Sequence, residues 1–191
     1  GLNESQQQAF ESAIHRRLTL IQGPPGTGKT FTAVRILSHL AQTSGQPVLA
    51  TAESNVAVDN LLEGLLEMGI NALRIGRPVK VRDHLRDATL DAHADAHHRQ
   101  EELNDLRDDF REINRELPSL KGKEKGLAHR DSRSLLQQIR RIEREVIDDV
   151  LSKAEVVCAT TVGCGHNIIA DRRFPIVLID EATQATEPSS I

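Results

Sequence analysis

The protein has 191 residues, of which 38% are hydrophobic and 27% charged, and its formal net charge is -4 at pH 7. This length suffices for one α/β domain with a buried core. No stretch approaches the roughly 18 apolar residues of a membrane-spanning helix, which excludes a membrane-embedded chain. The mild acidity excludes a strongly basic nucleic-acid-coating protein but permits a local binding groove. With no Trp, no Tyr and four Phe residues, a broad aromatic platform for stacking bases is also excluded.

Short apolar runs alternate with helix-periodic stretches in both flanks of the chain. Leucine spacing predicts one helix that continues to roughly Leu40 and another over 56–68. Short strands separated by helices are typical of a parallel sheet in an α/β fold. The predicted strands are residues 18–22, 47–51, 71–75, 155–160 and 175–180.

The middle of the chain differs from its flanks in charge. Of the 70 residues from His84 to Lys153, 30 are charged, against 22 of the other 121. Apolar residues at helical spacing around Phe110 and Ile139 predict two helices, which the loop 118–126 separates. We therefore expect an antiparallel helical hairpin at 84–153, inserted into an α/β core made of 1–83 and 154–191. Its charged faces are either solvated or a contact surface.

A glycine-rich segment follows the first predicted strand. GPPGTGKT, residues 23–30, fits the G-x-x-x-x-G-K-[ST] pattern, with a strand before it and a helix after it. In this motif backbone N–H groups face phosphate oxygens, Lys29 reaches the β and γ phosphates, and Thr30 ligates magnesium. The sequence therefore predicts a nucleoside triphosphate site. Its residues are Gly23, Pro24, Pro25, Gly26, Thr27, Gly28, Lys29 and Thr30.

Two acidic residues end the last predicted strand, in PIVLIDEATQ. Ligands of open parallel sheets gather at the carboxyl ends of strands, so Asp180 is expected to face the phosphate loop. We assign Asp180 to magnesium together with Thr30, and Glu181 to the attacking water. The expected catalytic residues are thus Lys29, Asp180 and Glu181. A helix N-cap is the alternative role for Asp180.

With these residues placed, the chain resembles a superfamily 1 helicase, most closely the nonsense-mediated-decay RNA helicases and their senataxin-type relatives. Four segments carry the resemblance: LNESQ at 2–6, ATAESNVAVDNL at 50–61, CATTVGCG at 158–165 and DEATQATEP at 180–188. The resemblance implies a RecA-like P-loop fold and an ATP-dependent motor that moves 5′-to-3′ on single-stranded RNA or DNA. It also implies that Gln6 binds adenine and selects ATP.

Two of these segments resemble motifs that hold a single strand. They contain Ser54, Asn55, Thr160, Thr161 and Gly163, which supply hydroxyl, amide and loop N–H groups suited to phosphate and sugar contacts. Binding through the sugar–phosphate backbone of the strand agrees with the scarcity of aromatic residues, and it predicts little preference for nucleotide sequence. A helix-cap or loop role is the alternative for each residue, above all for Ser54 and Asn55.

The family's second motor domain and its arginine fingers have no counterpart in these 191 residues. We therefore expect part of a longer protein, with negligible ATP hydrolysis by this piece alone, since an arginine finger contributes about 10³–10⁵ in rate. The two cysteines suggest reduced thiols and a cytoplasmic location, or a nuclear one in a eukaryote. Two other functions stay open: an AAA+ type ATPase, and a nucleotide-gated scaffold that binds a protein partner through the helical insertion.

Overall fold

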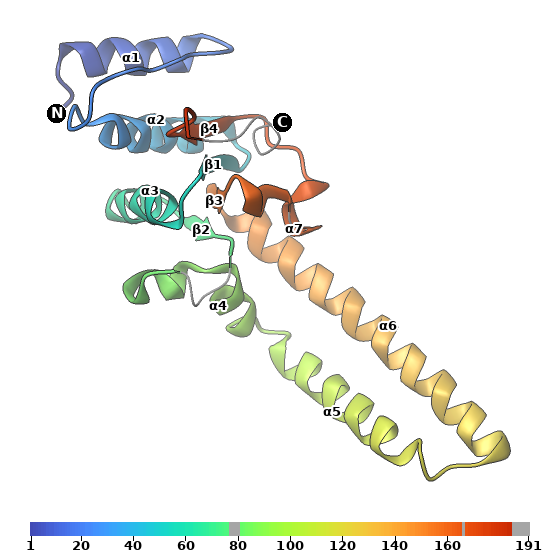
Figure 1. Ribbon diagram of the computed structural model, residues 1–191. Helices are drawn as coiled ribbons and strands as arrows, with labels where there is room; N and C mark the ends of the chain where they lie inside the picture. Colours follow the sequence, from blue (N-terminus) through green and yellow to red (C-terminus); the bar gives the residue numbers. More distant parts are fainter. Residues whose placement is uncertain (77–80, 166, 185–191) are drawn as a thin grey trace. The chain divides into compact units, whose positions relative to one another are not determined.

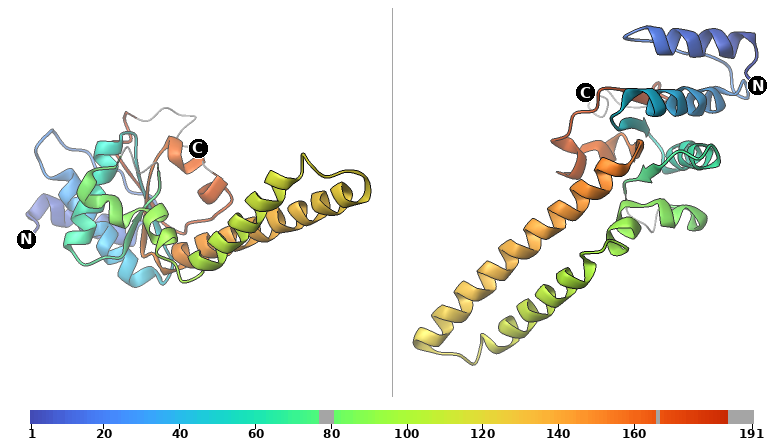
Figure 2. Two further views of the ribbon diagram at one scale, coloured as in Figure 1. Left: turned by 90° about the horizontal axis from the view of Figure 1, so that it is seen from below. Right: turned by 180° about the vertical axis from the view of Figure 1, so that it is seen from behind.

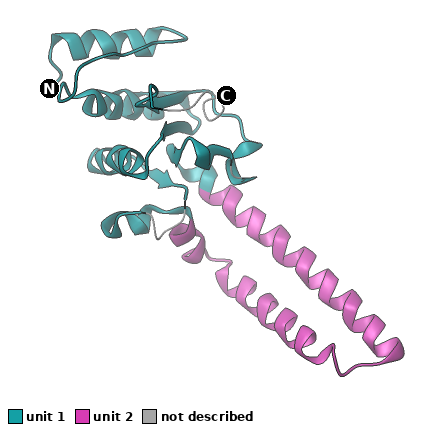
Figure 3. Cartoon of the chain, in the orientation of Figure 1, with its two compact units in different colours: residues 1–90, 151–191 teal, residues 91–150 magenta. Residues whose placement is uncertain are grey.

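The computed structural model describes residues 1–76, 81–165 and 167–184. The chain folds as two compact units (Figure 3). Unit 1 comprises residues 1–90 and 151–191, and unit 2 comprises residues 91–150. Unit 1 contains the sheet and the glycine-rich segment, whereas unit 2 is helical (Figure 1).

Unit 1 is built on a parallel sheet of four strands, in the order β2-β3-β1-β4. In register, Ala52 at the end of β1 lies opposite Thr160 of β3 on one side and Asp180 of β4 on the other. The sheet confirms the predicted α/β class, and four of the predicted strands are present within two residues of their expected bounds. These strands are β1 (Val48–Ala52), β2 (Ala72–Arg74), β3 (Val156–Thr160) and β4 (Val177–Asp180).

Helices of unit 1 cover the sheet with their apolar faces. In α2 and α3, buried residues recur at helical spacing, and Leu37 and Leu62 are fully enclosed against sheet residues such as Val156. Both helices occur where the leucine spacing predicts them. The helical elements are α1 (Glu4–His15), α2 (Lys29–Ser44), α3 (Asn55–Glu67), η2 (Asp83–Ala88), η3 (Val162–Gly165) and α7 (Asn167–Ala170).

The strand predicted at 18–22 is wrong. This segment is irregular, and Leu18 and Leu20 are 77% and 89% exposed. A strand needs a neighbour that accepts its hydrogen bonds, and none of the described strands pairs with this segment. Among the described residues β4 pairs with β1 alone, and its Val177 side chain is 51% exposed. A run of apolar residues indicates a segment that favours burial, but it does not indicate whether another strand will pair with that segment.

Unit 2 is an antiparallel pair of helices, α5 (Gln100–Glu116) and α6 (Gly122–Lys153, which continues into unit 1), preceded by α4 (Leu90–Asp95). The two run side by side (Figure 2), joined by the buried residues Leu103, Ile139, Ile142 and Val146. The hairpin is as predicted, but its loop is shorter than 118–126. Because α6 begins at Gly122, Lys123 and Lys125 are helical rather than loop residues. None of the described helices is both long and apolar enough to cross a membrane.

Candidate nucleotide and nucleic-acid site

The glycine-rich segment leads directly into α2. Gly28 is the N-cap of this helix and has the left-handed backbone angle φ 80°, as does Gly26 in the loop. A Cβ atom at Gly28 would lie 2.7 Å from Nε2 of Gln6, so a larger residue would collide with that side chain. The left-handed backbone therefore favours glycine here, and a larger residue would also have to displace the Gln6 amide. The amino end of α2, where anions bind favourably, opens onto the loop.

Gln6 connects α1 to this loop. The Asn3 side chain caps α1 by accepting from the Gln6 N–H at 2.9 Å, and the Gln6 Oε1 accepts from the Asn3 N–H at 3.0 Å. This reciprocal pair is a capping box. The Gln6 Nε2 group also donates to the Thr27 carbonyl at 3.0 Å. The residue that the resemblance assigns to adenine thus lies against the phosphate loop.

Inside the loop, side chains bond to the loop's own carbonyl groups. The Lys29 ammonium donates to the carbonyls of Gly23 and Pro24 at 2.9 and 3.1 Å, and the Thr27 hydroxyl donates to the latter at 2.8 Å. Pro24 and Pro25 are exposed. The ammonium therefore lies against carbonyl oxygens of the loop itself, and such a cation also suits an oxygen-rich ligand.

Asp180 and Thr30 lie together although 150 positions separate them. The Thr30 hydroxyl donates to Asp180 Oδ2 at 3.1 Å, while Oδ1 of the same carboxylate accepts from the Glu181 N–H at 3.0 Å. Asp180 is buried at the end of β4, and its carboxylate faces the start of α2. Hydroxyl and carboxylate oxygens are hard donors, the ligands that magnesium prefers, so this pair fits the predicted metal site.

Glu181 differs from Asp180 in its backbone. It is the one non-glycine residue in the described part of the chain with a positive φ, 52°, and its side chain is exposed. Left-handed backbone costs a residue with a Cβ about 1 kcal/mol or more and concentrates at functional sites. The predicted role of Glu181 toward water stays a prediction.

The expected strand-binding residues lie at or after the ends of β1 and β3, which are adjacent in the sheet. Ser54 is the N-cap of α3 and accepts from the Ala57 N–H at 3.1 Å, the alternative role that its residue type suggests. Thr160 accepts from the Gly163 N–H at 3.0 Å, and a Cβ at Gly163 would lie 2.8 Å from that hydroxyl oxygen. Both loops therefore have defined conformations.

Glu53 is a site residue that the sequence analysis missed. Its carboxylate accepts from the Thr161 hydroxyl at 2.5 Å and so joins the loop after β1 to the loop after β3. Thr161 is 4% exposed, and its N–H donates to the carbonyl of Ala52 at 3.0 Å. The position of Glu53 directly after a buried strand was the available signal. It makes the two loops one surface.

Arg74 was missed as well. Its guanidinium is 1% exposed and donates from Nε to Asp59 Oδ1 at 3.1 Å, from Nη2 to Asn55 Oδ1 at 2.8 Å, and from Nη1 to the Ile75 carbonyl. Asp59 is 2% exposed, and its other oxygen accepts from the Arg82 N–H. A buried charge requires such partners. A single arginine inside the apolar run NALRI was the signal in the sequence.

The two cysteines lie in and beside β3. Burial raises the pKa of the Cys158 thiol to about 12, although the nearby Arg74 guanidinium opposes the rise. Burial also raises the pKa of Cys164, whose Sγ contacts the Thr51 hydroxyl oxygen at 3.7 Å. Neither thiol ionises at neutral pH, which favours packing over nucleophilic chemistry. The described residues contain no cluster of three His, Cys, Asp or Glu side chains suited to a metal ion.

Comparison with known proteins now adds to this geometry. The sequence matches the family described as "AAA domain" over residues 1–191, its whole length. The chain belongs to this family. Relatives include the ATP-dependent helicase NAM7 of Saccharomyces cerevisiae, 35% identical over 100% of the chain and 18% of that protein. A Neurospora crassa homolog of regulator of nonsense transcripts 1 is 39% identical over 98% of the chain and 16% of that protein.

A third relative is the DNA polymerase alpha-associated DNA helicase A of Schizosaccharomyces pombe, 33% identical over 98% of the chain and 28% of that protein. Together these matches identify a motor domain of the superfamily 1 helicases, of the nonsense-mediated-decay type that the motifs indicate. The chain spans between 14% and 28% of the length of the curated relatives that it matches.

Proposed function

We propose that this chain is the ATP-binding motor domain of a nucleic-acid helicase that moves 5′-to-3′ along single-stranded RNA or DNA. The observation that carries the proposal is the Thr30–Asp180 hydrogen bond of 3.1 Å, which joins the phosphate loop to the carboxyl edge of the sheet. The strand-binding loops begin at this same edge, because Ala52 is in register with both Thr160 and Asp180. Helicase names among the relatives support the same activity.

In the proposed mechanism, ATP is the substrate and its phosphates lie over residues 23–30. The Lys29 ammonium leaves the carbonyls of Gly23 and Pro24 for the β and γ phosphate oxygens, a charge-assisted contact. Gln6, already bonded to the Thr27 carbonyl, turns its remaining amide capacity toward the adenine edge. Lys29 and Gln6, which bond to carbonyl groups of the loop, are thus also the two side chains proposed to bind the nucleotide.

Thr30 and Asp180 are the proposed magnesium ligands, and the exposed Glu181 carboxylate orients the attacking water. When bound, magnesium supplies neutralisation of the charge on the phosphate oxygens. The bond from the Glu181 N–H fixes one oxygen of Asp180 and leaves the other toward Thr30, which orients the carboxylate without a further side chain. A cytoplasmic location, or a nuclear one, is part of this proposal.

On the nucleic-acid side, Ser54, Asn55, Thr160, Thr161 and Gly163 are the proposed contacts with the sugar–phosphate backbone. The Glu53–Thr161 bond keeps the two loops together, so a strand meets them as one surface. We also propose that residues 1–83 and 154–191 form the ATP-binding core and residues 84–153 an insertion, in agreement with the division into units at 90 and 151.

The test uses the full-length protein that contains this chain, with an oligonucleotide-stimulated ATPase assay and a strand-separation assay on 5′-tailed duplexes. Lys29→Ala is expected to lower stimulated ATP hydrolysis about 10²–10³-fold, because one preorganised positive group on the phosphates is lost. Lys121→Ala, at an exposed lysine of unit 2, is the matched control and should leave hydrolysis unchanged. Partner-protein binding without strand separation by the wild type would favour the scaffold alternative instead.

A further inference from the structure

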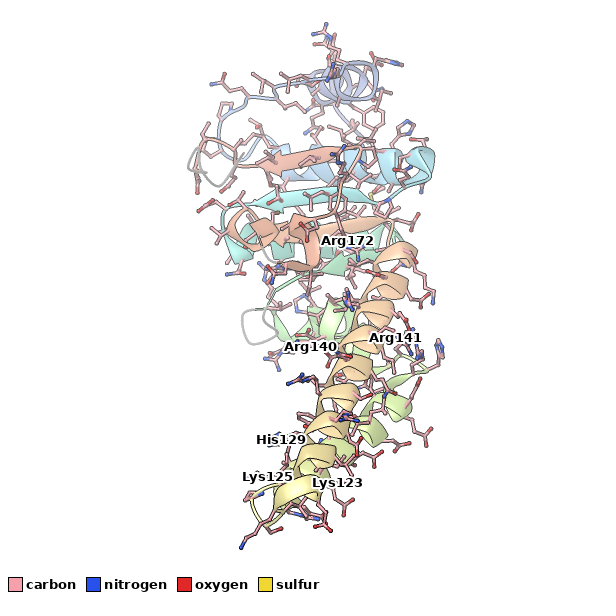
Figure 4. All side chains as sticks on the ribbon, turned by 90° about the vertical axis from the view of Figure 1, so that its right-hand side faces the viewer. Lys123, Lys125, His129, Arg140, Arg141 and Arg172 are labelled. Atoms are coloured by element: carbon pink, nitrogen blue, oxygen red, sulfur yellow. The ribbon has the colours of Figure 1, made fainter. Side chains whose placement is uncertain are left out.

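One face of α6 carries a row of positive side chains, which we call the basic stripe: Lys123, Arg130, Arg133, Arg140 and Arg144. Their spacings of seven, three, seven and four residues place them on one side of a helix. All five are exposed. From the first to the last arginine the row extends about 21 Å, at about 1.5 Å per residue. Figure 4 labels Arg140 along α6 and Lys123 toward the start of the helix.

Within the length of the basic stripe, the acids of α6 lie off this face; Asp148, four positions after Arg144, lies on the same side beyond the end of the stripe. Between the two ends of the basic stripe they are Glu124, Asp131 and Glu143, each one position from a stripe residue and thus turned about 100° around the helix. Glu143 is already bonded to Arg107 of α5 at 2.7 Å. From Lys123 to Arg140 the stripe therefore presents positive charge without a carboxylate on the same face, and Asp148 follows one turn after Arg144.

Pairing separates this face from the rest of unit 2. Every arginine of α5 forms an ion pair: Arg107 with Glu143, Arg111 with Asp108, and Arg115 with Glu112. In contrast, no ion pair is found for the five stripe residues within the described part of the chain, although Arg141, five full turns after Lys123 on α6, pairs with Glu145. Arg130 has Gly126 and Ser134 as its neighbours four positions away, so no local acid is available to it.

The stripe also sets like charges side by side. Arg130 and Arg133 are three residues apart and Arg140 and Arg144 are four apart, spacings at which like charges destabilise a helix. An external polyanion would relieve this repulsion. Guanidinium groups bind phosphate with paired N–H groups, and a row that extends for several phosphates suits a nucleic-acid backbone better than a single anion.

We propose that the basic stripe of α6 is a second nucleic-acid contact of the protein, a sequence-independent site for the sugar–phosphate backbone. The inference rests on the proposed helicase function, since it supplies the polyanion. It assigns a role to the charged insertion that the motifs of unit 1 do not explain. The proposed contacts are with phosphate oxygens, which position a strand and carry no sequence information.

The test measures oligonucleotide affinity of the full-length protein as a function of salt concentration. The stripe variant carries Arg130→Gln, Arg133→Gln, Arg140→Gln and Arg144→Gln. Four lost phosphate contacts should weaken binding of oligo(dT) at least about tenfold and flatten the slope of log affinity against log salt by about 3. Parallel titrations with a blunt duplex show whether the stripe binds a single strand or a duplex. The substitutions should flatten the salt dependence of affinity only for the nucleic acid that contacts the stripe.

Two further variants control the test. Arg111→Gln with Arg115→Gln removes two exposed arginines that are paired in α5, and the affinity and slope should stay those of the wild type. Replacement of the four stripe arginines by Lys keeps the charge and should restore most of the slope. If the Gln variant loses helical content, Arg133→Gln with Arg140→Gln alone should still flatten the slope by about 1.4.

An unchanged affinity and slope in a folded stripe variant would overturn the inference, and such a result would indicate an acidic protein partner for α6. Failure of the proposed function looks different, because the wild type itself would then bind no oligonucleotide and show no stimulated hydrolysis. ATP hydrolysis without nucleic acid should be the same in the wild type and the stripe variant, since no stripe residue belongs to the nucleotide site.

Discussion

Units 1 and 2 use charged side chains in opposite ways. In unit 1 the charges of Arg74 and Asp59 are buried, and bonds join residues far apart in sequence, as Arg74 with Asp59 and Glu53 with Thr161. In unit 2 the charges are on the surface and pair within one helix or between two adjacent helices, as in Arg111 with Asp108. Charged side chains therefore hold loops and strands in place in unit 1, whereas the exposed charged side chains of unit 2 can also contact a binding partner.

The largest predicted effect concerns the buried pair. Asp59→Ala leaves the Arg74 guanidinium buried and uncompensated, and we expect about 3–5 kcal/mol less free energy of unfolding. Arg111→Ala is the matched control from unit 2, where the partners are 71% and 67% exposed and the expected loss is about 0–1 kcal/mol. Urea unfolding measures both. Equal losses would remove the contrast between the units.

A second prediction uses pH. In unit 1 the pKa of Cys158 rises from 9.0 to about 12, so the folded protein favours the neutral thiol. This stabilisation is complete below pH 9, where folded and unfolded thiols are both protonated, and it is lost as the pH rises from 9 toward 12. The expected loss from this group is about 1.4 kcal/mol per pH unit. Thermal unfolding of Cys158→Ala should lack this component of the alkaline decline, whereas an identical decline would contradict the burial argument.

A third prediction concerns the joined loops. Thr161→Val removes the hydroxyl bonded to Glu53 at nearly constant volume, and we expect the oligonucleotide concentration for half-maximal ATPase stimulation to rise about tenfold. Hydrolysis without nucleic acid should change little. Thr43→Val, at an exposed threonine near the end of α2, is the matched control. A loss of unstimulated hydrolysis would show that the bond serves the nucleotide site.

The smallest predicted effect separates the two roles of Ser54. As the N-cap of α3 its hydroxyl contributes to stability, so Ser54→Ala should lower the free energy of unfolding by about 1 kcal/mol. Ser54→Asp keeps a capping oxygen but brings negative charge to the proposed strand contact. It should restore stability while weakening oligonucleotide binding. Wild-type oligonucleotide binding by Ser54→Asp would show that Ser54 is a helix cap and does not contact the strand.

The contrast between the units also explains what the sequence reveals. The phosphate loop and the acid pair at 180 and 181 are local motifs that residue type and spacing define, and the helix after the loop and the strand before the acid pair were predicted correctly. The helical hairpin could be predicted equally well from the sequence, because the backbone hydrogen bonds of a helix form within the helix and need no neighbouring element. The parallel sheet followed from short apolar runs, and the structure confirms it.

Other features depend on contacts that no local pattern encodes. The segment 18–22 has the composition of a strand, yet its hydrogen bonds need a neighbour, and its apolar side chains are exposed. Glu53 and Arg74 acquire their roles from residues 108 and 15 positions away, at Thr161 and Asp59. The glycines of the predicted loop do not break the helix: α6 begins at Gly122 and contains Gly126.

In the proposed mechanism, the carboxyl ends of the strands hold both ATP and the nucleic-acid strand, with Asp180 between them. The most direct measurement is steady-state ATP hydrolysis by the full-length protein, with and without oligo(dT), for Asp180→Asn and the exposed control Asp171→Asn. We predict that Asp180→Asn lowers stimulated hydrolysis about 10²–10³-fold while oligonucleotide binding persists, and that the control matches the wild type. Stimulated hydrolysis near the wild-type rate in Asp180→Asn would contradict the account.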